Sequence, residues 1–456
     1  MDKKSVGIIG YGRTGKALYS FLKNDPNYSK IMIFDDNEID KSNIGIDENG
    51  IPVEFLSGKN GISRLTESDQ IIISPGINGR EDRFTPLRES GIKFVSELEF
   101  AFSYIRSKII AVTGTNGKST TVSLIDHILK KSGWDSHLVG NIGVPFISEV
   151  KKIGENSITV LEISSFQLEE IDKFRANITA ILNVTPDHLD RYTSFSDYKD
   201  AKLNILKNLS KDDPLILNYD DLFLRKEFYK KGDNKFRILW FSVENRGFEE
   251  GAWLDSDRVV IRIGDRTENI SIKGNSLLGL HNLENILASF LVLRLFGISS
   301  SDQAKALGGF KGLHHRMEMC GEKSGVRFIN DSKATNVEAT IKSISGIDGD
   351  IAIILGGKDK GGNFSIIKNQ VGKKIKKIIL IGEAADAISA ALNLDKHFLT
   401  RANTLDEALR KGYEVLIGSG GSVLLAPGCA SFDMFKNYEE RGNIFKSNVK
   451  DFIEED

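Results

Sequence analysis

The chain has 456 residues, 40% of them hydrophobic and 27% charged, with 61 basic and 63 acidic side chains. This length exceeds what one hydrophobic core ordinarily supports, so we expect several domains. The formal net charge of -2 gives no indication of a polyanionic partner such as nucleic acid, and two cysteines are too few for a disulfide framework.

The N-terminal segment passes directly into an apolar run at Val6–Ile9, without the pattern of a secretion signal. The longest apolar helical stretch, Ile286–Phe296, is interrupted by Arg294 and is too short to span a membrane. We therefore expect a cytoplasmic protein with no membrane-inserted segment.

Short runs rich in valine and isoleucine recur along the chain and alternate with helix-length amphipathic segments. These runs are Val6–Ile9, Ile31–Phe34, Ile71–Ile73, Ile109–Val112, Ile158–Ile163, Ile178–Val184, Ile351–Leu355, Lys377–Ile381 and Val423–Leu425. Such alternation is typical of βαβ units and of parallel sheets covered on both faces. We predict an α/β protein with three domains, at residues 1–98, 99–312 and 313–456. The second domain is expected to carry inserted antiparallel strands near Asn245–Asn275.

The first glycine-rich turn, Gly10–Gly15, directly follows the strand at Val6–Ile9 and precedes a helical pattern. Glycines here let the backbone approach a diphosphate, which binds the free N–H groups at the helix N-terminus. Asp35 ends the second strand about 20 residues further on, where an acid binds a ribose hydroxyl in dinucleotide folds. Ser74-Pro75-Gly76 forms another turn at the same sheet edge. By itself this motif favours an NAD-binding domain.

A second glycine-rich loop, Gly114–Thr120, lies between the strand at Ile109–Val112 and an amphipathic helical segment. Its N–H groups can converge on phosphate oxygens, Lys118 can reach the β- and γ-phosphates, and Ser119 can bind Mg²⁺. Valine stands at position 112, where a strict Walker A motif has glycine. Two phosphate-binding turns favour a phosphate-activated reaction on a nucleotide-linked substrate over a dehydrogenase.

Polar side chains follow two later strands. Glu162 ends an apolar strand, and a buried acid there requires a metal or a charged partner. His188 lies in one strand-end loop with Asp187, Asp190 and Arg191, and this crowding favours a functional site over an isolated polar histidine.

Lys202 falls on the apolar face of a helical pattern. A lysine in this position often extends its ammonium group to solvent. Near the Mg²⁺ candidates Glu162 and His188, however, an ammonium would be repelled. A lysine carbamylated by CO₂ would instead offer the anionic oxygens that Mg²⁺ prefers.

Together these motifs resemble the Mur ligase family over essentially the whole chain. The matching segments are Gly114–Thr120, Gly140–Gly143, Leu161–Gln167, Asn183–Arg191, His281–Asn285, His314–Glu318 and Asn330–Asn336. Leu425–Gly442 is similar to the C-terminal signature of the D-glutamate-adding members, and the Asn-Pro-Arg motif of the diaminopimelate-adding members does not occur. The resemblance implies a Rossmann-like N-terminal domain, a central P-loop ATPase domain and a Rossmann-like C-terminal domain.

The resemblance also implies an activity. An ATP-dependent ligase would add D-glutamate to UDP-N-acetylmuramoyl-L-alanine through an acyl phosphate, in peptidoglycan precursor synthesis. It would act as a monomer, use ATP, two Mg²⁺ ions and a CO₂-derived carbamate on Lys202, and require closure of the third domain onto the second. Another ligase of the family and an NAD(P)-dependent oxidoreductase remain alternatives; the latter would leave Lys118, His188 and Lys202 without a role.

The resemblance assigns roles to individual residues. The implied catalytic residues are Lys118, His188 and Lys202. The implied ATP contacts are Gly114, Thr115, Asn116, Gly117, Lys118, Ser119, Thr120, Asn282, Asn285, Arg316 and Asp331. The implied Mg²⁺ ligands are Ser119, Glu162, His188 and Lys202. The implied contacts to the UDP substrate are Gly12, Arg13, Thr14, Asp35, Ser74, Asn141 and His188. The implied contacts to D-glutamate are Lys333, Thr335, Lys360, Ser431, Phe432 and Tyr438, with Lys360 favoured over Lys358.

Overall fold

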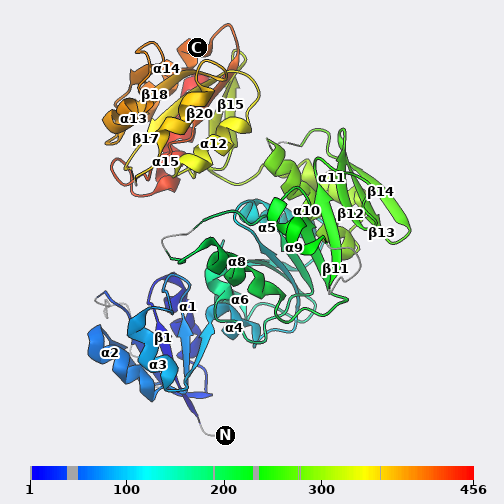
Figure 1. The fold of residues 1–456 in the computed structure, drawn as a ribbon, viewed down its shortest axis with the longest axis vertical. Helices are drawn as coiled ribbons and strands as arrows, with labels where there is room; N and C mark the ends of the chain where they lie inside the picture. The colour runs from blue at the N-terminus through cyan, green and yellow to red at the C-terminus, as the bar shows by residue number, and fades with distance from the viewer. Residues whose placement is uncertain are drawn as a thin grey trace. The chain divides into compact units, whose positions relative to one another are not determined.

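The computed structural model describes residues 3–37, 50–187, 191–229, 236–275, 277, 279–359 and 361–455. The chain forms two compact units. The first comprises Met1–Lys273 with Glu284–Leu307, and the second comprises Gly274–Leu283 with Gly308–Asp456. Both units are built from sheets flanked by helices, so the predicted α/β class is confirmed (Figure 1).

The N-terminal sheet of the first unit is parallel and has the strand order β3-β2-β1-β4-β5. Its strands are β1 (Lys4–Ile9), β2 (Tyr28–Phe34), β3 (Val53–Leu56), β4 (Gln70–Ile73) and β5 (Lys93–Ser96). Its helices are α1 (Arg13–Leu22), α2 (Gly58–Arg64), α3 (Thr85–Glu89) and α4 (Glu97–Phe102). The strand order reverses between β1 and β4. In such sheets ligands bind at this point, beyond the carboxyl ends of the strands.

The central sheet of the first unit has nine strands in the order β14-β13-β12-β11-β10-β9-β6-β8-β7. The strands are β6 (Lys108–Thr113), β7 (Ser136–Gly140), β8 (Ile158–Glu162), β9 (Ile178–Ile181), β10 (Pro214–Asn218), β11 (Arg237–Ser242), β12 (Gly251–Asp255), β13 (Arg258–Ile263) and β14 (Arg266–Ser271). The pairs β12–β13 and β13–β14 are antiparallel, and the other pairs are parallel. The antiparallel strands predicted near 245–275 are therefore confirmed.

Helices cover this sheet. They are α5 (Lys118–Lys131), α6 (Phe146–Glu149), α7 (Ser165–Leu168), α8 (Phe195–Leu203), α9 (Leu222–Phe228), α10 (Leu280–Leu295) and α11 (Ser300–Leu307). None of the helices in the described part of the chain is long and apolar enough to cross a membrane.

The second unit contains a six-stranded sheet with the order β15-β16-β20-β17-β18-β19. Its strands are β15 (Glu318–Lys323), β16 (Val326–Asn330), β17 (Ile351–Gly356), β18 (Ile375–Ile381), β19 (Leu399–Arg401) and β20 (Gly421–Leu425). Its helices are α12 (Val337–Ser345), α13 (Ala385–Leu392), α14 (Leu405–Leu416) and α15 (Tyr438–Glu454). Only β15 is antiparallel to its neighbour among the described pairs. This sheet brings the loops after β16, β17 and β20 to one edge.

Helix α4 joins the two sheets of the first unit. Glu97 accepts a hydrogen bond from the backbone N–H of Ile147 at 2.7 Å. Glu99 accepts three more from the backbone N–H groups of residues 172–174, each at 2.9 Å. Both carboxylates are buried, and apolar side chains of both sheets share one core around them. The domain boundaries at 98/99 and 312/313 stay predictions.

Candidate functional site

The first glycine-rich turn connects β1 to α1. Gly10 has φ +90°, which favours glycine, and a Cβ on Gly15 would overlap the carbonyl oxygen of Gly10. Glycine at position 15 therefore lets α1 start directly against the end of β1. Gly12 and Arg13 are exposed at the N-terminus of this helix, and Thr14 is half-buried.

Asp35 and Ser74 both contact this turn. The Asp35 carboxylate accepts a hydrogen bond from the Tyr11 N–H at 2.6 Å, and the Ser74 hydroxyl donates to the Gly10 carbonyl oxygen at 2.9 Å. The structure thus brings these two predicted substrate contacts to the glycine-rich turn, where they brace its backbone. Binding to a ribose hydroxyl remains a prediction for Asp35.

The second glycine-rich loop leads from β6 into α5. Gly117 precedes α5 with φ +85°, and a Cβ there would overlap the side-chain oxygen of Asn285. The Lys118 ammonium donates to the carbonyl oxygens of Gly114 at 2.7 Å and Thr115 at 3.0 Å. Ser119 is buried in the first turn of α5. The loop therefore has the strand–loop–helix geometry predicted for phosphate binding.

Asn183 supports the same loop, although no role was predicted for it. Its side-chain oxygen accepts from the Asn116 N–H at 2.8 Å, and its side-chain N–H₂ donates to the Asn116 carbonyl oxygen at 3.2 Å. Its backbone carbonyl oxygen accepts from the Thr115 N–H. The only indication in the sequence is its place just beyond an apolar strand. β9 ends at Ile181, earlier than predicted, because Asn183 bonds to the phosphate loop and the Val184 N–H donates to Asp221 instead of continuing the strand.

Glu162 ends β8, and in the register of β6 and β8 it lies beside Val112. Its side chain is 1% exposed. One carboxylate oxygen accepts from the Asn141 side-chain N–H₂ at 2.6 Å. The other is buried and has no hydrogen-bond partner among the described residues. An orphaned buried carboxylate oxygen is costly, and a cation ligated there would satisfy it. This geometry fits the predicted Mg²⁺ ligand.

Lys202 lies in α8 and is 1% exposed, so its ammonium group does not reach solvent. Its Nζ donates to the Gly114 carbonyl oxygen at 3.1 Å and lies 4.8 Å from the ring centroid of Tyr198. Burial, followed by the positive charge of Lys118, holds the pKa of Lys202 well below its ordinary value. A lowered pKa increases the fraction of neutral amine, which is the form that reacts with CO₂.

Two predicted site residues, His188 and Lys360, lie outside the described residues. Arg191 directly follows the first of these gaps. It donates to the carbonyl oxygens of Pro75 at 3.0 Å and Ile77 at 3.1 Å, and it pairs with Glu169 at 2.7 Å. Arg191 thus connects the loop after β9 to the turn that contains Ser74.

In the second unit, Asp331 and Lys333 follow β16, which pairs with β20. Asp331 accepts a hydrogen bond from the Ser343 hydroxyl, and burial raises its pKa to about 6. The Lys333 ammonium lies 3.9 Å from the ring centroid of Tyr438. Ser431 is buried after β20, whereas Phe432 is 66% exposed.

The remaining predicted residues lie in both units. Asn285 of the first unit accepts from the Thr121 hydroxyl at 3.2 Å, directly behind the phosphate loop. Asn282 of the second unit is buried. The positive charge of Arg316 lowers the pKa of Asp331 and so partly offsets the larger effect of burial. The backbone N–H of Thr335 donates to the Lys333 carbonyl oxygen at 2.8 Å.

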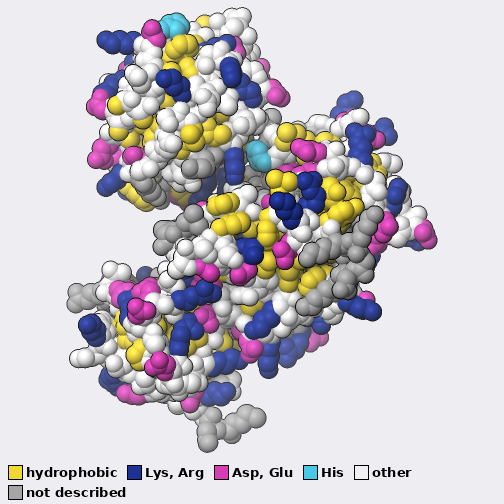
Figure 2. All heavy atoms as spheres, in the orientation of Figure 1, with side chains coloured by type: hydrophobic (Ala, Val, Ile, Leu, Met, Phe, Trp, Pro, Cys, Tyr) yellow, Lys and Arg dark blue, Asp and Glu magenta, His cyan; other side chains and the backbone are white. Residues whose placement is uncertain are grey.

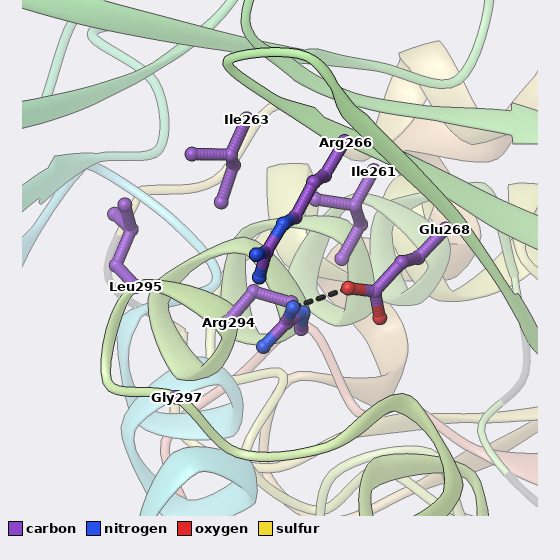
Figure 3. A pocket seen from close by; sticks show the side chains of 7 residues that line it. All are labelled: Ile261, Ile263, Arg266, Glu268, Arg294, Leu295 and Gly297. Carbon is purple, nitrogen blue, oxygen red and sulfur yellow. Dashed lines mark hydrogen bonds and ion pairs between the residues drawn. The ribbon is translucent and has the colours of Figure 1, made fainter.

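A separate pocket of about 280 Å³ lies at the far end of α10 from Asn285. Figure 3 shows its lining, in which Arg294 pairs with Glu268 and the side chain of Arg266 points toward this pair. None of the predicted site residues lines it. On the face drawn in Figure 2, basic and acidic side chains are interspersed over both units.

Three family models match the chain. Residues 4–96 match the Mur ligase MurD-like N-terminal domain, residues 112–293 the Mur ligase middle domain, and residues 315–429 the Mur ligase glutamate ligase domain. The chain is 40% identical over 451 residues to the UDP-N-acetylmuramoylalanine--D-glutamate ligase of Thermoanaerobacter sp. (strain X514), covering 98% of each chain. It is 38% identical over 454 residues to a protein of the same name from Acidobacterium capsulatum, covering 98% of this chain and 96% of that one.

Solved structures show a similar fold. A pseudomurein peptide ligase type C from Methanothermus fervidus has a TM-score of 0.58 and 17% identity, covering 99% of this chain and 100% of the other. A MurF ligase from Thermotoga maritima in complex with ADP also has a TM-score of 0.58, with 16% identity over 99% of this chain and 96% of that one. At these identities the likeness concerns the fold alone.

Proposed function

The chain belongs to the Mur ligase family, and we propose that it joins D-glutamate to UDP-N-acetylmuramoyl-L-alanine (UDP-MurNAc-L-Ala) with conversion of ATP to ADP and phosphate. The observation that carries this proposal is the 40% identity, over 98% of both chains, to a ligase of that name. The reaction belongs to peptidoglycan precursor synthesis, and we place it in the cytoplasm.

In the first step, a carboxylate oxygen of UDP-MurNAc-L-Ala attacks the γ-phosphorus of ATP. A new O–P bond forms, the bond between γ-phosphorus and the β–γ bridging oxygen breaks, and ADP leaves. Phosphoryl transfer depends mainly on positioning and charge stabilisation. Lys118, which donates to two loop carbonyl oxygens 2.7 and 3.0 Å away, turns to the γ-phosphate when the nucleotide binds.

Mg²⁺, when bound, neutralises phosphate charge and orients the reacting oxygens. Glu162 and Ser119 would hold one ion, because the orphaned oxygen of Glu162 lies at the end of β8, beside the strand that leads into the phosphate loop. His188 and a carbamylated Lys202 would hold a second. Asn141, which binds Glu162 at 2.6 Å, would face the acyl end of the substrate together with His188.

The carbamate on Lys202 has its own test. Lys202→Ala should lose activity, because its buried side chain lies beside Gly114 in the phosphate loop and would no longer supply anionic oxygens there. Added short carboxylates such as acetate or formate should restore part of the phosphate release. Unaltered activity of Lys202→Ala would exclude the carbamate.

In the second step, the D-glutamate amine attacks the acyl carbon. A tetrahedral intermediate forms, the C–O bond to phosphate breaks, and the amine loses a proton. Lys333, Thr335, Lys360, Ser431, Phe432 and Tyr438 bind D-glutamate, with the lysines pairing with its carboxylates. Asn282, Asn285, Arg316 and Asp331 contact the nucleotide. The UDP moiety binds at the glycine-rich turn through Gly12, Arg13, Thr14, Asp35 and Ser74.

Phosphate release from ATP in the presence of UDP-MurNAc-L-Ala tests the proposal. D-glutamate, L-glutamate, meso-diaminopimelate and no amino acid are compared. We expect release that requires both UDP-MurNAc-L-Ala and D-glutamate. Release with another amino acid would overturn the assignment of the amino-acid substrate, and absence of release with all of them would overturn the ligase assignment.

A further inference from the structure

Arg441 is a fully buried arginine in the first turn of α15, with 0% of its surface exposed. Arginine is almost never fully buried unless its charge is paired. Within the described part of the chain, its hydrogen bonds go to one hydroxyl and to backbone carbonyl oxygens, and none goes to a carboxylate. Such a group requires a structural explanation.

The guanidinium group links two loops that are far apart in the sequence. Its Nε donates to the Ser332 hydroxyl and its Nη2 to the Ser332 carbonyl oxygen, both at 2.9 Å. Nη1 and Nη2 both donate to the Cys429 carbonyl oxygen at 3.2 Å. One planar fork therefore holds the loop after β16 to the loop after β20, a geometry that the single ammonium of lysine cannot reproduce.

A third loop passes directly over the same group. Gly357 follows β17 with φ +133°, and a Cβ there would lie 3.2 Å from Arg441 Nη1 and would overlap the Ala430 carbonyl oxygen. The backbone just before Lys358 can therefore lie against the guanidinium because residue 357 has no side chain. Lys358 and Ala430 also exchange two backbone hydrogen bonds, at 2.8 and 3.0 Å.

These three loops carry all the side chains that the proposed function assigns to D-glutamate except Tyr438, which begins α15. Lys333 directly follows Ser332, and Ser431 lies two residues after Cys429. The Ser332 hydroxyl donates to the Tyr438 carbonyl oxygen at 2.8 Å, and the Lys333 ammonium lies 3.9 Å from the Tyr438 ring centroid. A shift of Ser332 would therefore move Lys333 relative to Tyr438.

We propose that Arg441 is the positioning residue of the amino-acid site, setting the separation of the loops that bind the two carboxylates of D-glutamate. This inference rests on the proposed function. Burial lowers the pKa of Arg441 to about 10, so the guanidinium stays charged at neutral pH. Its charge, which the nearby Asp433 partly offsets, therefore contributes a positive potential at the loops that would receive a dicarboxylate.

Steady-state phosphate release by the full chain tests this role in Arg441→Lys and Ser332→Ala. In Arg441→Lys the charge stays but the fork is lost, and we expect the KM for D-glutamate to rise by at least about tenfold. The KM values for ATP and UDP-MurNAc-L-Ala should stay unchanged. Ser332→Ala removes one acceptor of the fork and should raise the same KM by a smaller factor, so it keeps the test valid if Arg441→Lys does not fold.

Arg410→Lys is the matched control, because Arg410 lies in the same unit and forms exposed ion pairs with Asp406 and Glu455. It should leave all three KM values unchanged. If the wild-type chain uses D-glutamate but neither test variant alters its KM, Arg441 is not a positioning residue. If the wild-type chain does not use D-glutamate, the proposed function itself fails.

Discussion

At the scale of single residues, the positive charges at the phosphate loop are carried by lysine side chains that donate to backbone carbonyl oxygens. Lys118 and Lys202 both donate to the Gly114 carbonyl oxygen, at 2.7 and 3.1 Å. Besides the burial of Lys202, the two ammonium groups at one acceptor repel each other. Both effects lower the pKa of Lys202. A γ-phosphate would offer Lys118 a stronger acceptor and would relieve this crowding.

Lys118→Ala should reduce D-glutamate-dependent phosphate release by roughly 10²–10³-fold or more, because a charge on the transferring phosphoryl group is no longer neutralised. The fold should be retained, since the side chain donates to carbonyl oxygens of its own loop, at 2.7 and 3.0 Å, and pairs two elements through neither of these contacts. Circular dichroism and thermal melting would establish the fold. An active Lys118→Ala variant would refute the phosphate-loop assignment.

The raised pKa of Asp331 predicts that the stability of the second unit depends on pH. Burial raises its pKa from 3.8 to about 6, so the folded state binds more protons than the unfolded state between these values. The free energy of unfolding should therefore fall as the pH rises through this window, by on the order of 1–3 kcal/mol. In Asp331→Asn the amide replaces the neutral carboxyl group, and this decline should disappear.

Urea unfolding of the second unit from pH 4 to pH 7 would measure the decline. Asp451→Asn, which changes an exposed aspartate of α15, should behave like the wild-type chain. If the free energy of unfolding falls equally with pH in Asp331→Asn and in the wild-type chain, the prediction is contradicted.

At the scale of elements, short helices position the site by capping neighbouring segments. In α4, Glu99 binds three consecutive N–H groups at 2.9 Å, and Glu97 binds the N–H of Ile147 at 2.7 Å, in the helix α6. These contacts link the sheet that carries the glycine-rich turn after β1 to the sheet that carries the phosphate loop after β6. In the proposed reaction UDP-MurNAc-L-Ala would contact both loops, so α4 would act as a spacer between the two ends of the substrate.

Glu99→Ala should destabilise the first unit by about 1–3 kcal/mol, because three backbone N–H groups lose a buried acceptor. Hydrogen exchange should increase at residues 172–174, which donate to this carboxylate. Glu89→Ala removes an exposed glutamate from α3 and serves as the control. Equal hydrogen exchange at residues 172–174 in both variants would show that Glu99 of α4 does not stabilise this segment.

At the scale of the whole molecule, the chain consists of two compact units with separate cores. A chain of this kind is not expected to unfold in a single two-state transition. We expect two calorimetric transitions. UDP-MurNAc-L-Ala should raise only the midpoint temperature of the first unit, since its proposed contacts lie there and a ligand stabilises the folded unit by mass action. Equal shifts of both transitions would contradict this assignment.

Local patterns in the sequence were sufficient for the fold class, and they placed several candidate site residues at the strand ends and helix starts where the structure has them. Glycine spacing after β1 and β6 predicted both glycine-rich turns, because the turn, the helix start and the strand end are adjacent in the chain. The strand β16 was missed, since Arg327 interrupts its apolar run, and so was β10, which begins at Pro214. Helical spacing placed Lys202 on a buried face, and the structure buries it.

By itself the sequence determined the order of motifs, the type of fold and the residue types available for phosphate and carboxylate chemistry. Only the tertiary structure decided which distant groups meet. Arg441 donates to the Ser332 carbonyl oxygen across 109 positions, and Asn183 accepts from the Asn116 N–H across 67. Glu99 caps a segment 73 to 75 positions away. The physical reason is that hydrogen bonds to backbone groups leave no pattern in the partner's residue type, because every residue offers the same carbonyl oxygen and nearly every residue the same N–H.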